Sequence, residues 1–233
     1  MRIAVMQPYL FPYIGYFQLI HDVDKFVIYD DVQYIKGGWI NRNKLLVNNQ
    51  EYMFTFSVQE AEMKAKINDR CLSTKFLYEK DKFIKTISQN YKKAPYFSEA
   101  FDLILEILTT EERNLSDFIY QSILKINKYL EIDTEVLRSS NLPIRTFLNR
   151  EEKLIDIVKR LNGNVYINSI GGIKLYSKEN FKREGIDVYF LNSKPFLYFQ
   201  YREPFIPNLS VIDALMFNSK EELKDLLNNY ELV

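Results

Sequence analysis

Apolar residues fall into two kinds of segment along the chain, and their alternation predicts an α/β fold. Short continuous apolar runs are typical of buried strands, whereas longer segments with apolar residues every three or four positions are typical of helices. The runs predict strands over residues 3–5, 26–29, 134–138, 165–167 and 188–191. The longer segments predict helices over residues 16–21, 75–91, 96–108, 115–130, 150–161, 178–184, 209–215 and 221–229.

A β-hairpin is predicted between the second strand and the first long helix. Residues 39–47 and 51–58 are rich in β-branched and aromatic residues, and Asn48-Asn49 separates them as a turn signal. The polar residues 59–70 predict a loop with a short strand at 65–67. The order of elements predicts one domain, residues 1–233, with a Rossmann-like and mostly parallel sheet. Residues 72–132 are expected to form a helical layer or insert within it.

Composition excludes several classes of function. The chain has 31 basic and 31 acidic residues, and zero net charge disfavours nucleic acid and membrane surfaces as partners. A single cysteine, Cys71, excludes an internal disulfide, and a single histidine, His21, disfavours a zinc enzyme or a His-based triad. No apolar run approaches the ~20 residues of a membrane span, and no signal peptide precedes the first strand. We expect a cytoplasmic protein with no protein metal site, and the sequence names no cofactor.

Most candidate site residues follow the first two strands. Ligands bind in open α/β sheets outside the carboxyl ends of the strands. We therefore expect one polar and aromatic site at that edge, formed by Gln7, Tyr9, Tyr13, Tyr16, Asp30, Asp31, Arg42 and Asn43.

The loop over residues 11–16 has the spacing of the phosphate loop in nucleotidylyltransferase-type enzymes, and the predicted fold resembles theirs. Tyr13 and Tyr16 stand around Gly15 where those enzymes have two histidines. A helix N-terminus binds phosphate whatever side chains surround it, but tyrosine is neutral at pH 7 and cannot replace an imidazolium. The loop therefore favours nucleotide binding over nucleotidylyl transfer. Alternatively, the tyrosines pack beneath the loop.

Asp30 and Asp31 end the second strand. Adjacent strand residues point to opposite faces, so at most one carboxylate is expected to enter the site. There it could act as a general base, bind a sugar hydroxyl or amine, or hold a magnesium ion through water. A turn or helix-capping role is the alternative.

Three other segments carry candidate binding residues. Arg42, beside Asn43, is suited to a bidentate contact with phosphate or carboxylate, although an isolated arginine on a strand is usually solvated. Ser169 with Gly171 and Gly172 could bring backbone N–H groups close to an anion, although a tight turn also explains the glycines. Ser210, three residues before an aspartate, is read as a binding residue or, more simply, as a helix cap.

Several of these stretches resemble the WbqC-like protein family over nearly the whole chain. The matching residues are Gln7-Pro8, Pro12, Gly15-Tyr16-Phe17, Phe26-Val27, Asp30-Asp31-Val32-Gln33, Trp39, Asn41-Arg42-Asn43, Tyr91, Ala94-Pro95-Tyr96-Phe97, Tyr166, Gly171-Gly172, Tyr176, Phe181, Gly185-Ile186, Pro207-Asn208-Leu209-Ser210 and Asp213. Two departures are Glu79-Lys80-Asp81-Lys82, where the family tends to have a Lys-His pair, and Asn168-Ser169, where it has Ser-Gly.

The resemblance implies a bacterial surface-polysaccharide (O-antigen) protein that transfers glycine or another small aminoacyl group to an amino sugar. The acceptor would be a nucleotide-linked amino sugar, and the donor an aminoacyl thioester on a carrier protein or an aminoacyl adenylate. Our leading hypothesis places the diphosphate at the start of the first helix with Arg42 as its charge partner, and gives Asp30 or Asp31 the role of base. A nucleotidylyltransferase-like enzyme acting on a nucleoside triphosphate is the second hypothesis. A non-catalytic nucleotide-sugar binding protein is the third.

Overall fold

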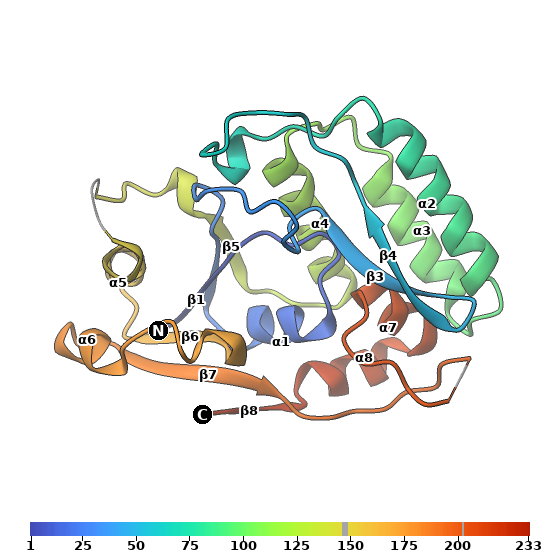
Figure 1. Ribbon diagram of the computed structural model, residues 1–233. Coiled ribbons are helices and arrows are strands. Elements are labelled where there is room, and N and C mark those ends of the chain that lie inside the picture. Colours follow the sequence, from blue (N-terminus) through green and yellow to red (C-terminus); the bar gives the residue numbers. More distant parts are fainter. Residues whose placement is uncertain (146–148, 202) are drawn as a thin grey trace.

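A six-stranded, mostly parallel sheet forms the centre of the computed structural model, which describes residues 1–145, 149–201 and 203–233 (Figure 1). The strand order is β5-β2-β1-β6-β7-β8, and only β7 and β8 pair antiparallel. The strands are β1 (Arg2–Met6), β2 (Lys25–Ile28), β5 (Glu135–Arg138), β6 (Val165–Ser169), β7 (Asp187–Ser193) and β8 (Tyr230–Leu232). The predicted mostly parallel sheet is confirmed, and the short edge strand β8 was not predicted.

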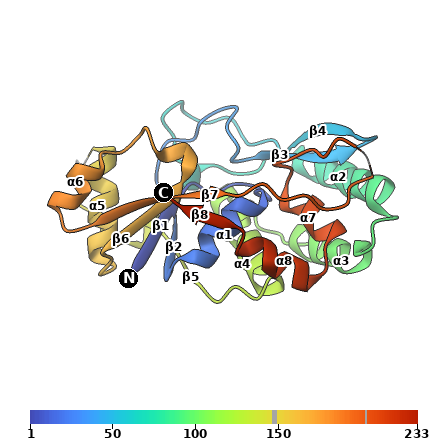
Figure 2. The same cartoon turned by 90° about the horizontal axis from the view of Figure 1, so that it is seen from below.

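Helices cover both faces of the sheet. Successive residues of a strand point to opposite faces, and the apolar residues on each face are buried against helices. In β1, Ile3 and Val5 pack with α5 (Arg150–Arg160) and α6 (Lys178–Arg183), whereas Ala4 belongs to the core on the opposite face. That face carries α1 (Ile14–Asp22), α4 (Leu115–Tyr129) and α8 (Lys220–Leu227) (Figures 1 and 2). The continuous apolar runs of the sequence therefore reflect strands buried on both sides.

A second group of elements lies at the end of the molecule away from α5 and α6 (Figure 2). It contains the antiparallel hairpin β3 (Arg42–Val47) and β4 (Gln50–Thr55) with α2 (Phe76–Tyr91), α3 (Phe97–Leu108) and α7 (Val211–Phe217). Its apolar residues are continuous with the core on the α1 face. The predicted hairpin is confirmed, and both residues of its Asn48-Asn49 turn have positive φ, as a type I′ turn requires.

The predicted strand at 65–67 does not form. A single bridge between Gln33 and Lys66 replaces it, and a 3-10 turn, η1 (Ile67–Asp69), follows directly. Two further 3-10 turns, η2 (Ser139–Asn141) and η3 (Ile170–Gly172), follow β5 and β6. No helix within the described ranges is long and apolar enough to cross a membrane.

Candidate functional site

The strand order reverses at β1, which lies between β2 and β6. In an open α/β sheet, a ligand crevice forms at such a reversal, outside the carboxyl ends of the strands. We use the term carboxyl edge for the residues that follow the four neighbouring parallel strands, namely 7–9, 29–31, 139–140 and 170–172. Most of the residues predicted for the site lie there or on α1 beside it.

Asp30 is completely buried at this edge. Its carboxylate lies within hydrogen-bond distance of the Ser116, Ser139 and Ser140 hydroxyl groups and of the Ser140 amide, at 2.8–3.1 Å. These groups belong to α4 and η2, so one side chain joins the exit of β2 to two segments about 90 to 110 residues away. The geometry gives Asp30 an anchoring role, with both oxygens occupied and shielded from solvent.

Asp31 is the partly accessible member of the pair. Its side chain is 17% exposed and forms an ion pair with Lys153 of α5, with Nζ 2.6 Å from Oδ2. The Ser139 hydroxyl lies within hydrogen-bond distance of Asp31 as well as Asp30. The Lys153 ammonium also lies over the Tyr29 ring, 4.9 Å from its centroid. Asp31 is thus a positioned carboxylate that a bound substrate could reach.

Four tyrosines, Tyr9, Tyr29, Tyr166 and Tyr176, interact with one another at this edge, and Tyr29 contacts the ion pair through Lys153. Burial raises the pKa of Tyr9, and the Arg150 guanidinium at the start of α5 partly offsets that shift. Burial also raises the pKa of Tyr29 and Tyr166, with Tyr176 adding to both shifts and Arg150 opposing them. The Tyr9, Tyr29 and Tyr166 hydroxyl groups are therefore neutral donors at physiological pH.

The exit of β6 supplies one open backbone segment. Gly172 is required for packing, because a Cβ there would lie 2.7 Å from the Asn168 side chain. At the exposed Gly171 a Cβ would meet only the Ser169 hydroxyl, at 4.0 Å. Gln7 is half-buried, and its carbonyl accepts a hydrogen bond from the Tyr16 hydroxyl. Gln7 and Gly171 therefore lie at the carboxyl edge, and Ser169 ends β6 directly before it. Gly172 is buried against the Asn168 side chain.

The N-terminus of α1 is covered by its own residues. A Cβ on Gly15 would lie 2.3 Å from the Tyr13 ring and 2.8 Å from the Ser193 hydroxyl. Tyr16 is buried, with its ring 5.7 Å from that of Tyr9. The Tyr13 ring therefore lies against the start of α1, where it also lines a cavity with Ile14 and Ser193, and phosphate binding at this helix stays a prediction.

Asn43 and Ser210 are buried and hold the loop at Phe11. The Asn43 amide donates to the carbonyls of Leu10 and Phe11, and the Ser210 hydroxyl donates to the Phe11 carbonyl at 2.8 Å. Phe11 has a φ of 43°, which is rare for a bulky residue and is sustained only by surrounding contacts. Ser210 also caps α7, by accepting a hydrogen bond from the Ile212 amide.

Arg42 is separate from this group. Its guanidinium donates to the Gly37 and Gly38 carbonyls and lies over the Trp39 ring. It lines a cavity of about 890 Å³ between the β2–β3 and β4–η1 connections. Arg42 and the tyrosines around Asp31 therefore belong to two different parts of the surface.

The match to a known family covers most of this architecture. The model of the WbqC-like protein family matches residues 7–225. The chain belongs to the WbqC-like family. It is also 28% identical over 232 residues to the uncharacterized protein Rv1507c of Mycobacterium tuberculosis (strain ATCC 25618 / H37Rv), with 97% of each chain covered. No solved structure matches the chain.

Sequence reasoning did not include the tyrosines Tyr29, Tyr166 and Tyr176 among the site residues of this WbqC-like chain. It also missed Ser139, Ser140, Arg150 and Lys153. The two serines directly follow a predicted parallel strand, so the strand-exit argument would have placed them there. Arg150 and Lys153 share one face of α5 as an i, i+3 pair, but the sequence does not reveal how that helix lies against the sheet.

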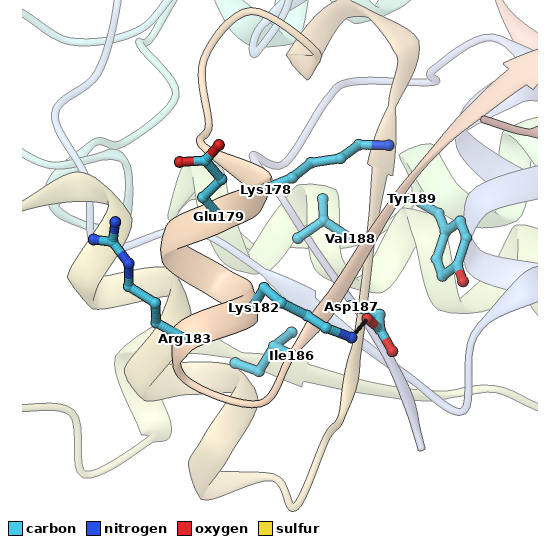
Figure 3. Close-up of a pocket in the computed structure, with 8 residues that line it drawn as sticks. All are labelled: Lys178, Glu179, Lys182, Arg183, Ile186, Asp187, Val188 and Tyr189. Carbon is cyan, nitrogen blue, oxygen red and sulfur yellow. Dashed lines mark hydrogen bonds and ion pairs between the residues drawn. The ribbon is translucent and has the colours of Figure 1, made fainter.

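A separate groove of about 660 Å³ lies between α6 and β7 (Figure 3). None of the residues predicted for the site lines it. Lys182 and Asp187 form an exposed ion pair across it, and the Asp187 carboxylate raises the pKa of Lys182. Glu179 and Arg183 point away from that pair. The Lys182–Asp187 pair of this groove is exposed to solvent. We therefore place the candidate site at the carboxyl edge.

Proposed function

We propose that this protein transfers a glycyl or similar small aminoacyl group onto the amine of a nucleotide-linked amino sugar, in bacterial surface-polysaccharide (O-antigen) biosynthesis. The observation that carries the proposal is the Asp31–Lys153 pair, a partly exposed carboxylate at the exit of β2, next to the reversal of strand order at β1, with the Lys153 ammonium over the Tyr29 ring. Membership of the WbqC-like family supports the same class of reaction.

In this proposal Asp31 accepts a proton from the sugar ammonium, which frees the amine lone pair for attack. The amine nitrogen forms a bond to the acyl carbon of an aminoacyl thioester on a carrier protein, or of an aminoacyl adenylate. The bond from that carbon to sulfur or to phosphate oxygen breaks. The second proton lost by the nitrogen passes to the departing sulfur, so that the carrier leaves as a thiol, or to solvent when the leaving group is the adenylate phosphate. In the same proposal Lys153 stabilises the developing oxyanion, and Arg150 contacts a phosphate. Such a reaction depends mainly on positioning and one base.

The first test is a panel of nucleotide-linked amino sugars, nucleotides and nucleoside triphosphates in a thermal-shift experiment, followed by acyl-transfer assays. A ligand that binds the folded state raises the unfolding midpoint by mass action. We expect a nucleotide-linked amino sugar to raise it and to be acylated. Magnesium-dependent turnover of a triphosphate would instead support a nucleotidylyltransferase-like enzyme. Binding without turnover of any donor would support a non-catalytic binding protein.

Replacement of Asp31 by Asn sharpens this test. We expect Asp31→Asn to lower the transfer rate by about 100-fold or more, the scale of a lost general base, with about 1–3 kcal/mol of lost stability because the mostly buried Lys153 ammonium loses its counter-charge. The matched control is Asp117→Asn. Asp117 also forms a partly buried ion pair, with Arg138, whose guanidinium lies over the Tyr120 ring. Equal rate losses in the two variants would contradict the assignment of Asp31.

A further inference from the structure

The cavity that contains Arg42 holds a buried arginine without a counter-charge. Arg70 is only 7% exposed and lines this cavity. One Nη donates to the Glu62 carbonyl at 3.0 Å, and Nε is buried without a hydrogen-bond partner. No carboxylate among residues 1–145, 149–201 and 203–233 forms an ion pair with it. An unpaired buried charge costs several kcal/mol, so the site is incomplete as it stands.

Two other cations face the same space. Lys36 and Arg42 line the cavity with Arg70, against one carboxylate, that of Glu60. The Arg70 guanidinium lies over the Tyr34 ring, 5.0 Å from its centroid. Burial raises the pKa of Tyr34, and the positive charges of Arg70 and Arg42 oppose that shift.

The walls of the cavity are fixed by backbone contacts. The Tyr34 amide donates to the Ala65 carbonyl, and the Gln33 side chain donates to the Met63 carbonyl. The backbone of Arg70 is held by the Ile67 carbonyl and by the Leu115 amide. The cationic groups are therefore presented from ordered segments, which is the condition for preorganised binding.

We infer that this cavity binds a phosphate or diphosphate group of a small molecule, with Arg70 as the central contact and Arg42 and Lys36 beside it. A guanidinium fork matches phosphate oxygens in a bidentate arrangement, and a volume of about 890 Å³ accommodates more than the phosphate alone. Phosphate binding here does not require the proposed transfer reaction, although the substrates of that reaction would carry such a group. The phosphate could belong to a nucleoside diphosphate or to a phosphopantetheine group.

The test measures binding of inorganic phosphate, pyrophosphate and acetate by thermal shift and calorimetry. We expect phosphate and pyrophosphate to bind and acetate to bind more weakly. Arg70→Gln is expected to weaken pyrophosphate binding by about 10-fold to 100-fold, the scale of a lost charged hydrogen bond, and Lys36→Gln by a smaller factor. A nucleoside diphosphate and phosphopantetheine are then compared, and the tighter ligand identifies the source of the phosphate.

Arg113→Gln is the matched control. Arg113 also lies over an aromatic ring, that of Phe76, and has a buried nitrogen without a partner, but it does not line the cavity. Equal weakening by Arg70→Gln and Arg113→Gln, or no binding of phosphate and pyrophosphate to the unaltered protein, would overturn the inference. Arg70→Met separates binding from folding: we expect an unfolding midpoint no lower than that of the unaltered protein in phosphate-free buffer, together with loss of the pyrophosphate shift.

Discussion

Two regions of this molecule each bury a carboxylate completely, and they do so with different partners. At the carboxyl edge, Asp30 is surrounded by three serine hydroxyl groups and an amide. Near the hairpin, Asp213 accepts hydrogen bonds from the Tyr91 and Tyr198 hydroxyl groups and from the Gln200 amide, at 2.6–2.9 Å. In both regions a single side chain joins segments that are distant in the sequence.

The regions differ in what lies next to the buried carboxylate. Asp30 is followed by Asp31, whose ion pair with Lys153 remains partly exposed. Asp213 lies within α7, where every residue is buried. Burial with full hydrogen bonding therefore characterises an anchor in both places, and at the carboxyl edge the next residue, Asp31, keeps a partly exposed carboxylate.

The largest expected effect is that of Asp30→Ala. Removal of the carboxylate leaves the Ser116 and Ser140 hydroxyl groups and the Ser140 amide without an acceptor in the core, and we expect a loss of about 3–5 kcal/mol in the free energy of unfolding. Urea denaturation measures this. Asp30→Asn, which keeps the shape and one acceptor oxygen, is expected to lose less. A change below about 1 kcal/mol in Asp30→Ala would show that these contacts do not anchor β2.

The sequence pattern was sufficient for most of this framework. The strands of the parallel sheet are continuous apolar runs, and the long helices α2, α3 and α4 have apolar stripes at helical spacing. The strand β8 was missed because three residues, Tyr230–Leu232, are too few to show a period. The prediction of a strand at 65–67 was wrong because those residues pair with the β2–β3 connection at one bridge only.

The second expected effect concerns the Asp213 region. The Tyr91 hydroxyl accepts a hydrogen bond from the Leu46 amide and donates one to Asp213, so Tyr91→Phe leaves two buried groups without partners. We expect a loss of about 2 kcal/mol in unfolding free energy. Tyr198→Phe removes one donor from an oxygen that Gln200 still contacts, and about 1 kcal/mol is expected. Equal losses would show that the Leu46 contact adds nothing.

The site was less predictable than the fold, for a physical reason. Strand period places Asp30 and Asp31 on opposite sides but does not say which one is buried. That depends on Ser116 and Ser140, which come from other parts of the chain. Likewise, Arg42 was expected beside the tyrosines, and the structure places it in the cavity with Arg70 because the hairpin turns away from the sheet.

The smallest expected effect is the pH dependence of stability that Asp213 contributes. Burial raises the pKa of Asp213, although Tyr198, Gln200 and Tyr91 oppose the shift. The folded state therefore holds this proton at pH values where the unfolded chain has lost it. The resulting stabilisation is complete below the ordinary aspartate pKa, about 3.9, and is lost as pH rises through the raised value.

Asp213→Asn removes this titration, so we expect the unfolding free energy of the unaltered protein, relative to that of the variant, to fall as pH rises from about 3 to 7. Urea denaturation of both proteins at each pH measures the difference. Asp156→Asn provides a control of opposite sign. Burial alone would raise the pKa of Asp156, but the Arg160 and Arg145 guanidinium groups lower it. The stability that Asp156 contributes to the folded state is therefore lost as pH falls. If the stability of the unaltered protein relative to Asp213→Asn also rises with pH, the hydrogen-bond donors around Asp213 lower its pKa by more than burial raises it.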